Sequence, residues 1–167
     1  MKPISILQVD GAKEIALELN SLSKTFNMAG WRVGMVLGNS NFINQILKVK
    51  SNMDSGMFYG IQKGAIEALH LSEDWFKNQN DEYEERRALI FKLADKLNCT
   101  YNENSTGLFV WAKIQEGKKA EEVTDAILYD KDIFITPGTV FGSQGEGYIR
   151  FSLCVSKVVI NQALKRF

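Results

Sequence analysis

Apolar residues in the first 71 positions form two short aliphatic runs followed by two helical patterns. The runs "EIALEL" (14–19) and "RVGMVLG" (32–38) are bounded by loop residues, which is typical of strands. Ser40 is suited to cap a helix, and the apolar residues after it recur at helical spacing: Phe42, Ile43, Ile46, Leu47 and Val49. A second helix is predicted by Ile61, Ala65, Ile66 and Leu69. Lys24 is therefore expected just beyond the end of the first strand.

The chain from residue 72 onward begins with a long charged helix and continues with alternating strands and helices. Ser72 is expected to open the helix, whose apolar stripe would be Trp75, Phe76, Tyr83, Leu89, Ile90, Leu93 and Leu97. The pattern then predicts a strand (107–114), a helix (120–130), a strand (132–136), a turn (137–142), a strand (147–154) and a final helix from about Ser156. This alternation indicates an α/β or α+β layer packed on helices.

Composition and charge indicate a globular protein with a small ligand. The 167 residues include 20 basic and 20 acidic side chains, so the net charge gives no reason to expect nucleic acid or an anionic membrane as a partner. No run approaches the roughly 18 apolar residues of a membrane span, and the N-terminus lacks the apolar core of a signal peptide. Two distant cysteines favour a reducing compartment, so a cytoplasmic location is expected.

Metal chemistry and nucleophilic triads find little support in the sequence. His70 is the only histidine, and its place late in an amphipathic helix favours a packing or surface role. The two cysteines, Cys99 and Cys154, form no CxxC pair, and no carboxylates cluster at ligand spacing. No metal site is therefore predicted.

The segment "NSLSKTFNMAGWRVGMVLGN" (20–39) holds the residues best suited to covalent chemistry. A lysine fixed at a strand end, as expected for Lys24, can form an imine with a carbonyl compound. Ser21 and Ser23 can donate hydrogen bonds, and Arg32 can make a bidentate contact to a phosphate. Two glycines beside Arg32, at positions 30 and 34, would let the backbone approach or bend around a ligand. Together these residues indicate an anionic, phosphorylated, carbonyl-bearing cofactor.

The pattern S-x-S-K-x-x-x-x-x-G-x-R-x-G resembles that of the class I and II aminotransferases, the pyridoxal-phosphate enzymes of fold type I. The segments "NSLSKTFNMAGWRVG" and "KSNMDSGMFYGIQKGAIEAL" look most like the subgroup that includes aspartate and LL-diaminopimelate aminotransferases. The resemblance implies that Lys24 bonds covalently to the cofactor and that Ser21, Ser23 and Arg32 surround its phosphate. It also implies a homodimer for the full-length enzyme.

A second motif, "TPGTVFGSQGEGYIRFSLC" (136–154), resembles the family signature P-G-x-x-F-G-x-x-G-x-G-Y-x-R. The resemblance implies that Arg150 grips the α-carboxylate of the substrate, for which a planar guanidinium on a strand is well suited. The implied reaction moves an amino group between an L-amino acid and a 2-oxo acid. Trp31 and Phe141, beside the motif residues, either line this site or pack in the core.

Only 23 residues precede Lys24, whereas the family places most of its cofactor-binding residues upstream of the lysine. Asp10 is in the wrong context to pair with the cofactor's ring nitrogen. The expected fold is therefore α/β, the C-terminal part of a fold type I transferase: residues 1–71 as a remnant of the large cofactor-binding domain, with uncovered apolar surface, and residues 72–167 as the small domain. The chain alone is expected to bind pyridoxal 5'-phosphate weakly or not at all.

Two alternatives remain open at the level of sequence. The chain could be an inactive truncated fragment that serves only as a folded or dimerising domain. It could also belong to a pyridoxal-phosphate-dependent lyase, because one scaffold supports several reactions.

Overall fold

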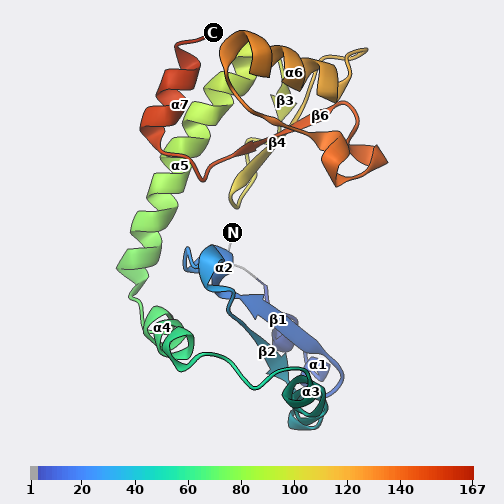
Figure 1. The fold of residues 1–167 in the computed structure, drawn as a ribbon, viewed down its shortest axis with the longest axis vertical. Helices are drawn as coiled ribbons and strands as arrows, with labels where there is room; N and C mark the ends of the chain where they lie inside the picture. The colour runs from blue at the N-terminus through green and yellow to red at the C-terminus, as the bar shows by residue number, and fades with distance from the viewer. Residues whose placement is uncertain (1–3) are drawn as a thin grey trace. The chain divides into compact units, whose positions relative to one another are not determined.

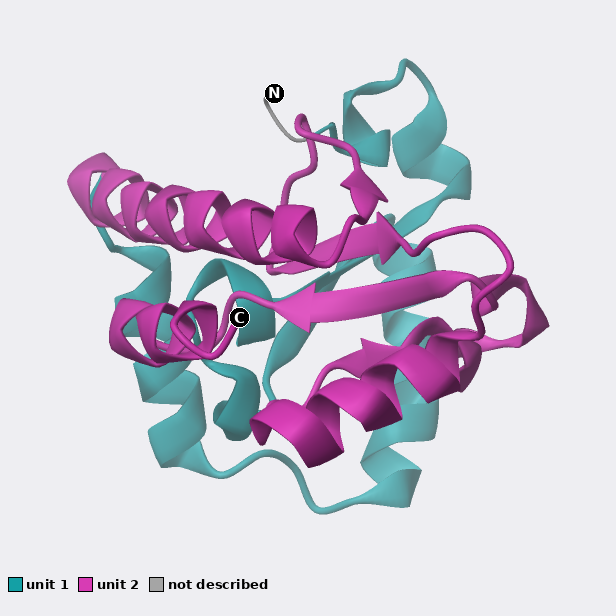
Figure 2. Ribbon diagram, turned by 90° about the horizontal axis from the view of Figure 1, so that it is seen from above, with its two compact units in different colours: residues 1–72 teal, residues 73–167 magenta. Residues whose placement is uncertain are grey.

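A computed structural model describes residues 4–167, which divide into two compact units with the boundary between residues 72 and 73 (Figures 1 and 2). Each unit has its own hydrophobic cluster, and each is described by itself below.

The first unit contains an antiparallel hairpin and several helices (Figure 1). Strands β1 (Leu17–Ser21) and β2 (Gly34–Gly38) pair in a register that runs from Leu17 opposite Gly38 to Ser21 opposite Gly34. The other elements are η1 (Ile6–Gln8), α1 (Ala12–Ile15), α2 (Leu22–Thr25), η2 (Ala29–Trp31), α3 (Ser40–Met53) and α4 (Tyr59–Leu69). The prediction that Lys24 lies just beyond a strand end is confirmed, because β1 ends at Ser21.

Two local predictions for the first unit were wrong in detail. The strand expected at 14–19 is split, since α1 ends at Ile15 and β1 begins only at Leu17. One helical turn is too short to produce a periodic pattern, so sequence reasoning merged the turn with the strand. The N-cap of α3 is Asn39 rather than Ser40, because the Asn39 side chain accepts a hydrogen bond of 2.8 Å from the Asn41 amide.

The second unit is a four-stranded antiparallel sheet with three helices. Its elements are α5 (Glu73–Lys96), β3 (Thr100–Tyr101), β4 (Phe109–Lys113), α6 (Ala120–Lys131), β5 (Thr136–Pro137), η3 (Gly138–Phe141), η4 (Ser143–Gly145), β6 (Tyr148–Ser152) and α7 (Lys157–Leu164). The strand order is β3-β4-β6-β5. The strand expected at 132–136 was placed too early, since β5 pairs with β6 only at Thr136 and Pro137. Asp132 adopts a left-handed conformation that ends α6.

One face of this sheet forms the core of the second unit. Val110 and Ala112 of β4 and Ile149 and Phe151 of β6 are buried, whereas the residues between them are not. The buried residues form one cluster with side chains of α5, α6 and α7, among them Leu93, Ile127 and Ile160. The alternation in β6 therefore places Arg150 on the opposite face from the core.

The first unit has a much smaller core. Its buried cluster is Leu22, Met28, Val33 and Ala68, against fifteen buried residues in the cluster of the second unit. Many large apolar side chains of the first unit are exposed, including Ile15, Leu19, Met53 and Phe58. The expected uncovered apolar surface of residues 1–71 is thus present in the part of the chain that the structure describes.

Candidate functional site

The β1–β2 hairpin gathers the residues of the lysine motif at one end. Ser21 pairs with Gly34, and the next rung is a hydrogen bond of 3.2 Å from the Leu22 amide to the Val33 carbonyl. Lys24 lies two residues after Leu22 in the chain, and Arg32 lies one residue before Val33. Residues eight positions apart in sequence are therefore held beside the same hairpin end.

Short-range hydrogen bonds fix the local conformation around the lysine. The Ser21 hydroxyl caps the one-turn helix α2 by accepting a hydrogen bond of 3.2 Å from the Ser23 amide. Lys24 and Ser21 are exposed, whereas Ser23 is buried at 9% exposure. Of the two serines, Ser21 is thus the more accessible to a ligand.

Arg32 has an unusual backbone and an exposed side chain. Its φ of 53° lies in the left-handed region, and its Nη1 donates a hydrogen bond of 2.9 Å to the Ala29 carbonyl. A non-glycine residue in this conformation is uncommon and stores modest strain. The remaining donors of the guanidinium are directed to no other residue among positions 4–167, so they are free to bind an anion.

The two glycines of the lysine motif have different roles. A Cβ at position 34 would lie 2.8 Å from the Asn20 carbonyl oxygen, so Gly34 permits the close approach of the hairpin strands. A Cβ at position 30 would meet nothing within 4 Å, so Gly30 is not required by packing within the chain. The half-exposed Trp31 ring packs over Gly64 of α4, a helix of the same unit.

This donor set suits pyridoxal phosphate in part. An exposed amine, a hydroxyl and a guanidinium at one hairpin end match the aldehyde and the phosphate of that molecule. Asp10, in the same unit, forms no hydrogen bond that would direct it toward this end among the described residues. The hairpin thus supplies groups for the aldehyde and the phosphate, and no partner for the ring nitrogen.

The glycine-rich motif of the second unit folds into two tight turns that precede β6. Gly138 of η3 and Gly145 of η4 lie backbone to backbone, and a Cβ on either would overlap the carbonyl oxygen of the other. Gly142 and Gly147 have φ values of 117° and 80°, which disfavour other residues. The backbone conformation and close packing of these turns therefore account for all four glycines of the motif.

Glu146 ties these turns to helix α6. Its Oε1 accepts hydrogen bonds from the backbone amides of Ala120 (2.8 Å) and Gly147 (3.0 Å), and these bonds lower the pKa of the carboxyl below its usual value of 4.5. A depressed pKa in the folded state contributes stability that is present above pH 4.5 and is lost as the pH falls through the folded-state pKa.

We therefore expect Glu146→Gln to lower the free energy of unfolding more at pH 6 than at pH 3, because protonation of the wild-type carboxyl reduces the difference as the pH falls. Urea denaturation at the two pH values measures the difference. Glu116→Gln, in an exposed turn of the same unit, is the control and should show no such pH-dependent loss. An equal loss at both pH values would contradict a role for the charge.

Arg150 lies on β6 among aromatic rings. Its guanidinium carbon is 4.2 Å from the ring centre of Phe109 and 4.1 Å from that of Phe141. The Trp111 ring contacts Phe141 edge to face, with centroids 5.7 Å apart, and stacks on Tyr148 at 5.5 Å. No hydrogen bond or ion pair joins the guanidinium to another side chain or backbone group within residues 4–167, so its N–H donors are available to a ligand.

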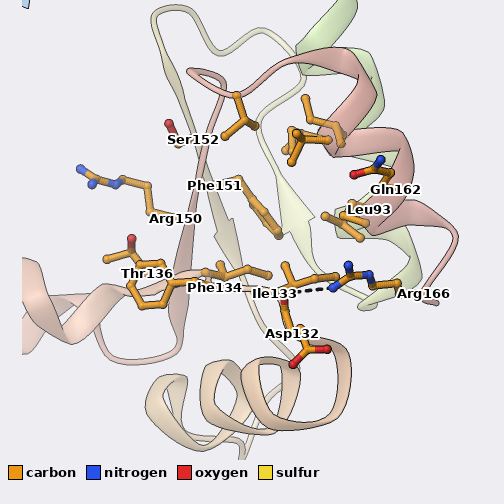
Figure 3. Close-up of a pocket in the computed structure, with 16 residues that line it drawn as sticks. Leu93, Asp132, Ile133, Phe134, Thr136, Arg150, Phe151, Ser152, Gln162 and Arg166 are labelled. Atoms are coloured by element: carbon orange, nitrogen blue, oxygen red, sulfur yellow. Dashed lines mark hydrogen bonds between the residues drawn. The ribbon is translucent and has the colours of Figure 1, made fainter.

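A cavity of about 380 Å³ is bounded by β5, β6, α5 and α7. Figure 3 shows Phe151 directed toward the helices and Arg150 directed away from them. The cavity is lined mainly by apolar side chains such as Leu93, Ile133 and Ile160. Asp132, Gln162 and Arg166 add polar groups to the lining, and Arg150 also contributes to it.

The structure places the sequence-predicted residues in two groups. Ser21, Ser23, Lys24 and Arg32 belong to the first unit and meet at the hairpin end, and Arg150 belongs to the second unit. Sequence reasoning identified Phe141 as a residue beside the motif but missed Phe109. Phe109 precedes Trp111 by two residues in a predicted strand, so the sequence already indicated that both side chains lie on one face of the sheet.

Two further classes of feature are absent from residues 4–167. No three His, Cys, Asp or Glu side chains lie together in a way that could hold a metal ion. No helix is both long enough and apolar enough to cross a membrane.

Residues 1–167 match the family described as aminotransferase class I and II over their whole length. The chain belongs to the class I and II aminotransferases. The LL-diaminopimelate aminotransferase of Maridesulfovibrio salexigens is 41% identical over 165 residues, which cover 99% of this chain and 42% of that protein. The chain thus spans about two fifths of the length of the curated relatives it matches.

Solved structures agree with this assignment. Apo-BacF from Bacillus subtilis matches with a TM-score of 0.87 and 31% identity, covering 99% of this chain and 43% of that one. The aromatic aminotransferase from Pyrococcus horikoshii matches with a TM-score of 0.86 and 28% identity, covering 97% and 44%. The predictions of the family and of an α/β fold type I scaffold are confirmed, and the mixed helix and sheet structure is that of an aminotransferase.

Proposed function

We propose that this aminotransferase chain carries the lysine-bearing and carboxylate-binding part of an enzyme that moves an amino group between an L-amino acid and a 2-oxo acid. The proposal rests on one observation above all, the gathering of exposed Lys24 with Ser21 and Arg32 at the end of one hairpin. The family implies the cofactor pyridoxal 5'-phosphate. When bound, this group supplies an electron sink for the carbon from which the substrate loses a proton.

The proposed roles follow from the chemistry of each side chain. Lys24 holds the cofactor through its amine and, once released, moves a proton at the substrate α-carbon. Arg32 and the Ser21 hydroxyl bind the phosphate, with Ser23 supporting the turn through its amide. Arg150 holds the substrate carboxylate through two parallel N–H donors, so that the bond to be broken is fixed in direction.

The remaining parts of the proposal concern the whole protein. Residues 1–71 would belong to the large cofactor-binding domain and residues 72–167 to the small domain. The longer enzyme would act on amino-acid and 2-oxo-acid substrates as a homodimer in the cytoplasm. LL-diaminopimelate is the substrate class named for the relatives, and it is one candidate donor here.

The exposed apolar side chains of the first unit favour a second possibility for the chain by itself. A four-residue core and many uncovered aliphatic residues are unfavourable for a rigid cofactor pocket. In this case the chain alone is an inactive domain. A lyase on the same scaffold would use Lys24 and Arg150 in the same way.

Reductive trapping tests the assignment of Lys24. Purified chain is titrated with pyridoxal phosphate, reduced with borohydride and mapped by peptide mass spectrometry. We expect low total labelling with the Lys24 peptide as the dominant product, and loss of that product in Lys24→Ala. Lys48→Ala, an exposed lysine on α3 of the same unit, should leave it unchanged.

Two results would change the proposal. Labelling spread evenly over the lysines would contradict a special role for Lys24. One label per chain at Lys24 would support the assignment and contradict the expectation of weak binding by the chain alone.

A further inference from the structure

Arg150 is flanked by aromatic rings that reach it from two neighbouring strands. In the order β3-β4-β6-β5, the arginine strand β6 lies between β4 and β5. Phe109 is on β4, and Phe141 is at the end of η3, which continues directly from β5. The rings therefore approach the guanidinium from opposite neighbours, at 4.2 and 4.1 Å from its central carbon.

Both rings are held by the fold. Phe109 is part of the β4–β6 ladder, where it pairs with Ser152. Phe141 is contacted by the Trp111 ring, and its turn is tied to α6 by a hydrogen bond of 2.9 Å from the Thr139 hydroxyl to Glu121. The backbone that carries each ring is thus held in place by contacts within the unit.

This arrangement restricts the guanidinium without using its donors. Aromatic rings attract a guanidinium through its π faces, so the N–H groups at its edge stay free for hydrogen bonding. Arg150 has no polar partner among residues 4–167, and Figure 3 shows the side chain directed away from the apolar interior. A long side chain that would otherwise sample many rotamers is thereby limited to few, which reduces the entropy lost on binding.

We propose that Phe109 and Phe141 are positioning residues that hold the guanidinium of Arg150 with its N–H edge open to a substrate carboxylate. This inference rests on the proposed function, in which Arg150 binds that carboxylate. Neither ring touches the reacting atoms, so their effect would be on the affinity for the carboxylate. Removal of one ring is expected to weaken that affinity by about 3- to 10-fold, within the range of single cation–π contacts.

Nuclear magnetic resonance of the full chain separates positioning from binding. With arginine labelled by ¹⁵N, the Nε–H signal of Arg150 is assigned by its loss in Arg150→Lys. Ring currents should displace this signal from those of exposed arginines, and Phe141→Leu and Phe109→Leu should each move it toward them. Phe141→Tyr keeps a ring and should preserve the shift, and Tyr129→Leu, an exposed residue on α6, is the control.

Titration with acetate at constant ionic strength then measures carboxylate binding. We expect the acetate concentration at half the shift to rise about 3- to 10-fold in the two leucine variants and to stay unchanged in Phe141→Tyr and Tyr129→Leu. Phe141 is half exposed, so its substitution should leave the unit folded.

The outcomes distinguish the inference from the proposed function. An Arg150 signal that is not displaced by the rings, or leucine variants that bind acetate as well as the wild type, would overturn the positioning role. Displacement by the rings with no response to acetate in any variant would overturn Arg150 as the carboxylate ligand, and the positioning proposal with it.

Discussion

Gly145→Ala is expected to destabilise the second unit strongly. Gly145 and Gly138 lie backbone to backbone where η3 and η4 meet, and a Cβ at position 145 would overlap the Gly138 carbonyl oxygen. The obstacle is rigid main chain, so no side-chain rotation can relieve it. Gly145 is also buried, and the turn must move as a whole to admit the methyl group.

The expected loss is about 3 kcal/mol or more in the free energy of unfolding, at the upper end of overpacking costs. Urea denaturation followed by circular dichroism measures it. Gly138→Ala should have a similar effect, since a Cβ there would also come within 2.7 Å of the Tyr148 carbonyl oxygen.

Gly117→Ala provides the matched control for this prediction. Gly117 has a φ of 82°, but a Cβ at that position would meet nothing within 4 Å. Its substitution should therefore cost only the conformational penalty of about 1 kcal/mol. If Gly145→Ala proved no more destabilising than Gly117→Ala, the close crossing of the two turns would be refuted.

Amide hydrogens in the core of the second unit are expected to exchange with solvent at least about 100-fold more slowly than the slowest amides of the first unit. The reason is the difference between the two cores. Fifteen buried residues pack together in the second unit and four in the first. Since burial of one aliphatic side chain contributes about 1.5–3 kcal/mol, the first unit has far less to oppose local opening.

Hydrogen exchange monitored by mass spectrometry of peptides would test this difference. The strands β4 and β6 and the middle of α5 should be the most protected segments, and β1, β2 and α3 should exchange early. Leu22→Ala should accelerate exchange only in the first unit, and Ile149→Ala should act mainly in the second. Equal protection of the two units would contradict the expected difference in exchange between them.

Sequence reasoning located the longer elements because their patterns repeat several times. The helices α3, α4, α5 and α6 each contain two or more turns with apolar residues on one side, and all four were predicted. The elements that were missed or misplaced, such as β3, β5 and α2, are two to four residues long. Tertiary contacts rather than local periodicity decide whether such short segments form.

The candidate site was recoverable from motifs but not from periodicity. Lys24 and Arg32 could be linked because both belong to the motif S-x-S-K-x-x-x-x-x-G-x-R-x-G. The contacts of Arg150 with Phe109 could not be inferred, because they depend on which strand lies next to β6. Strand order is set by the packing of the whole unit, which a single segment does not report.

The alternation of residues along β6 couples the binding surface to the hydrophobic core. Ile149 and Phe151 face the helices, and Arg150 between them faces the opposite way. A slip of one residue in strand pairing would bury a charged guanidinium and expose two large apolar side chains at once. A chain with this strand out of register would therefore lose both core packing and ligand binding. Folding errors in β6 would then yield no stable species that is partly functional.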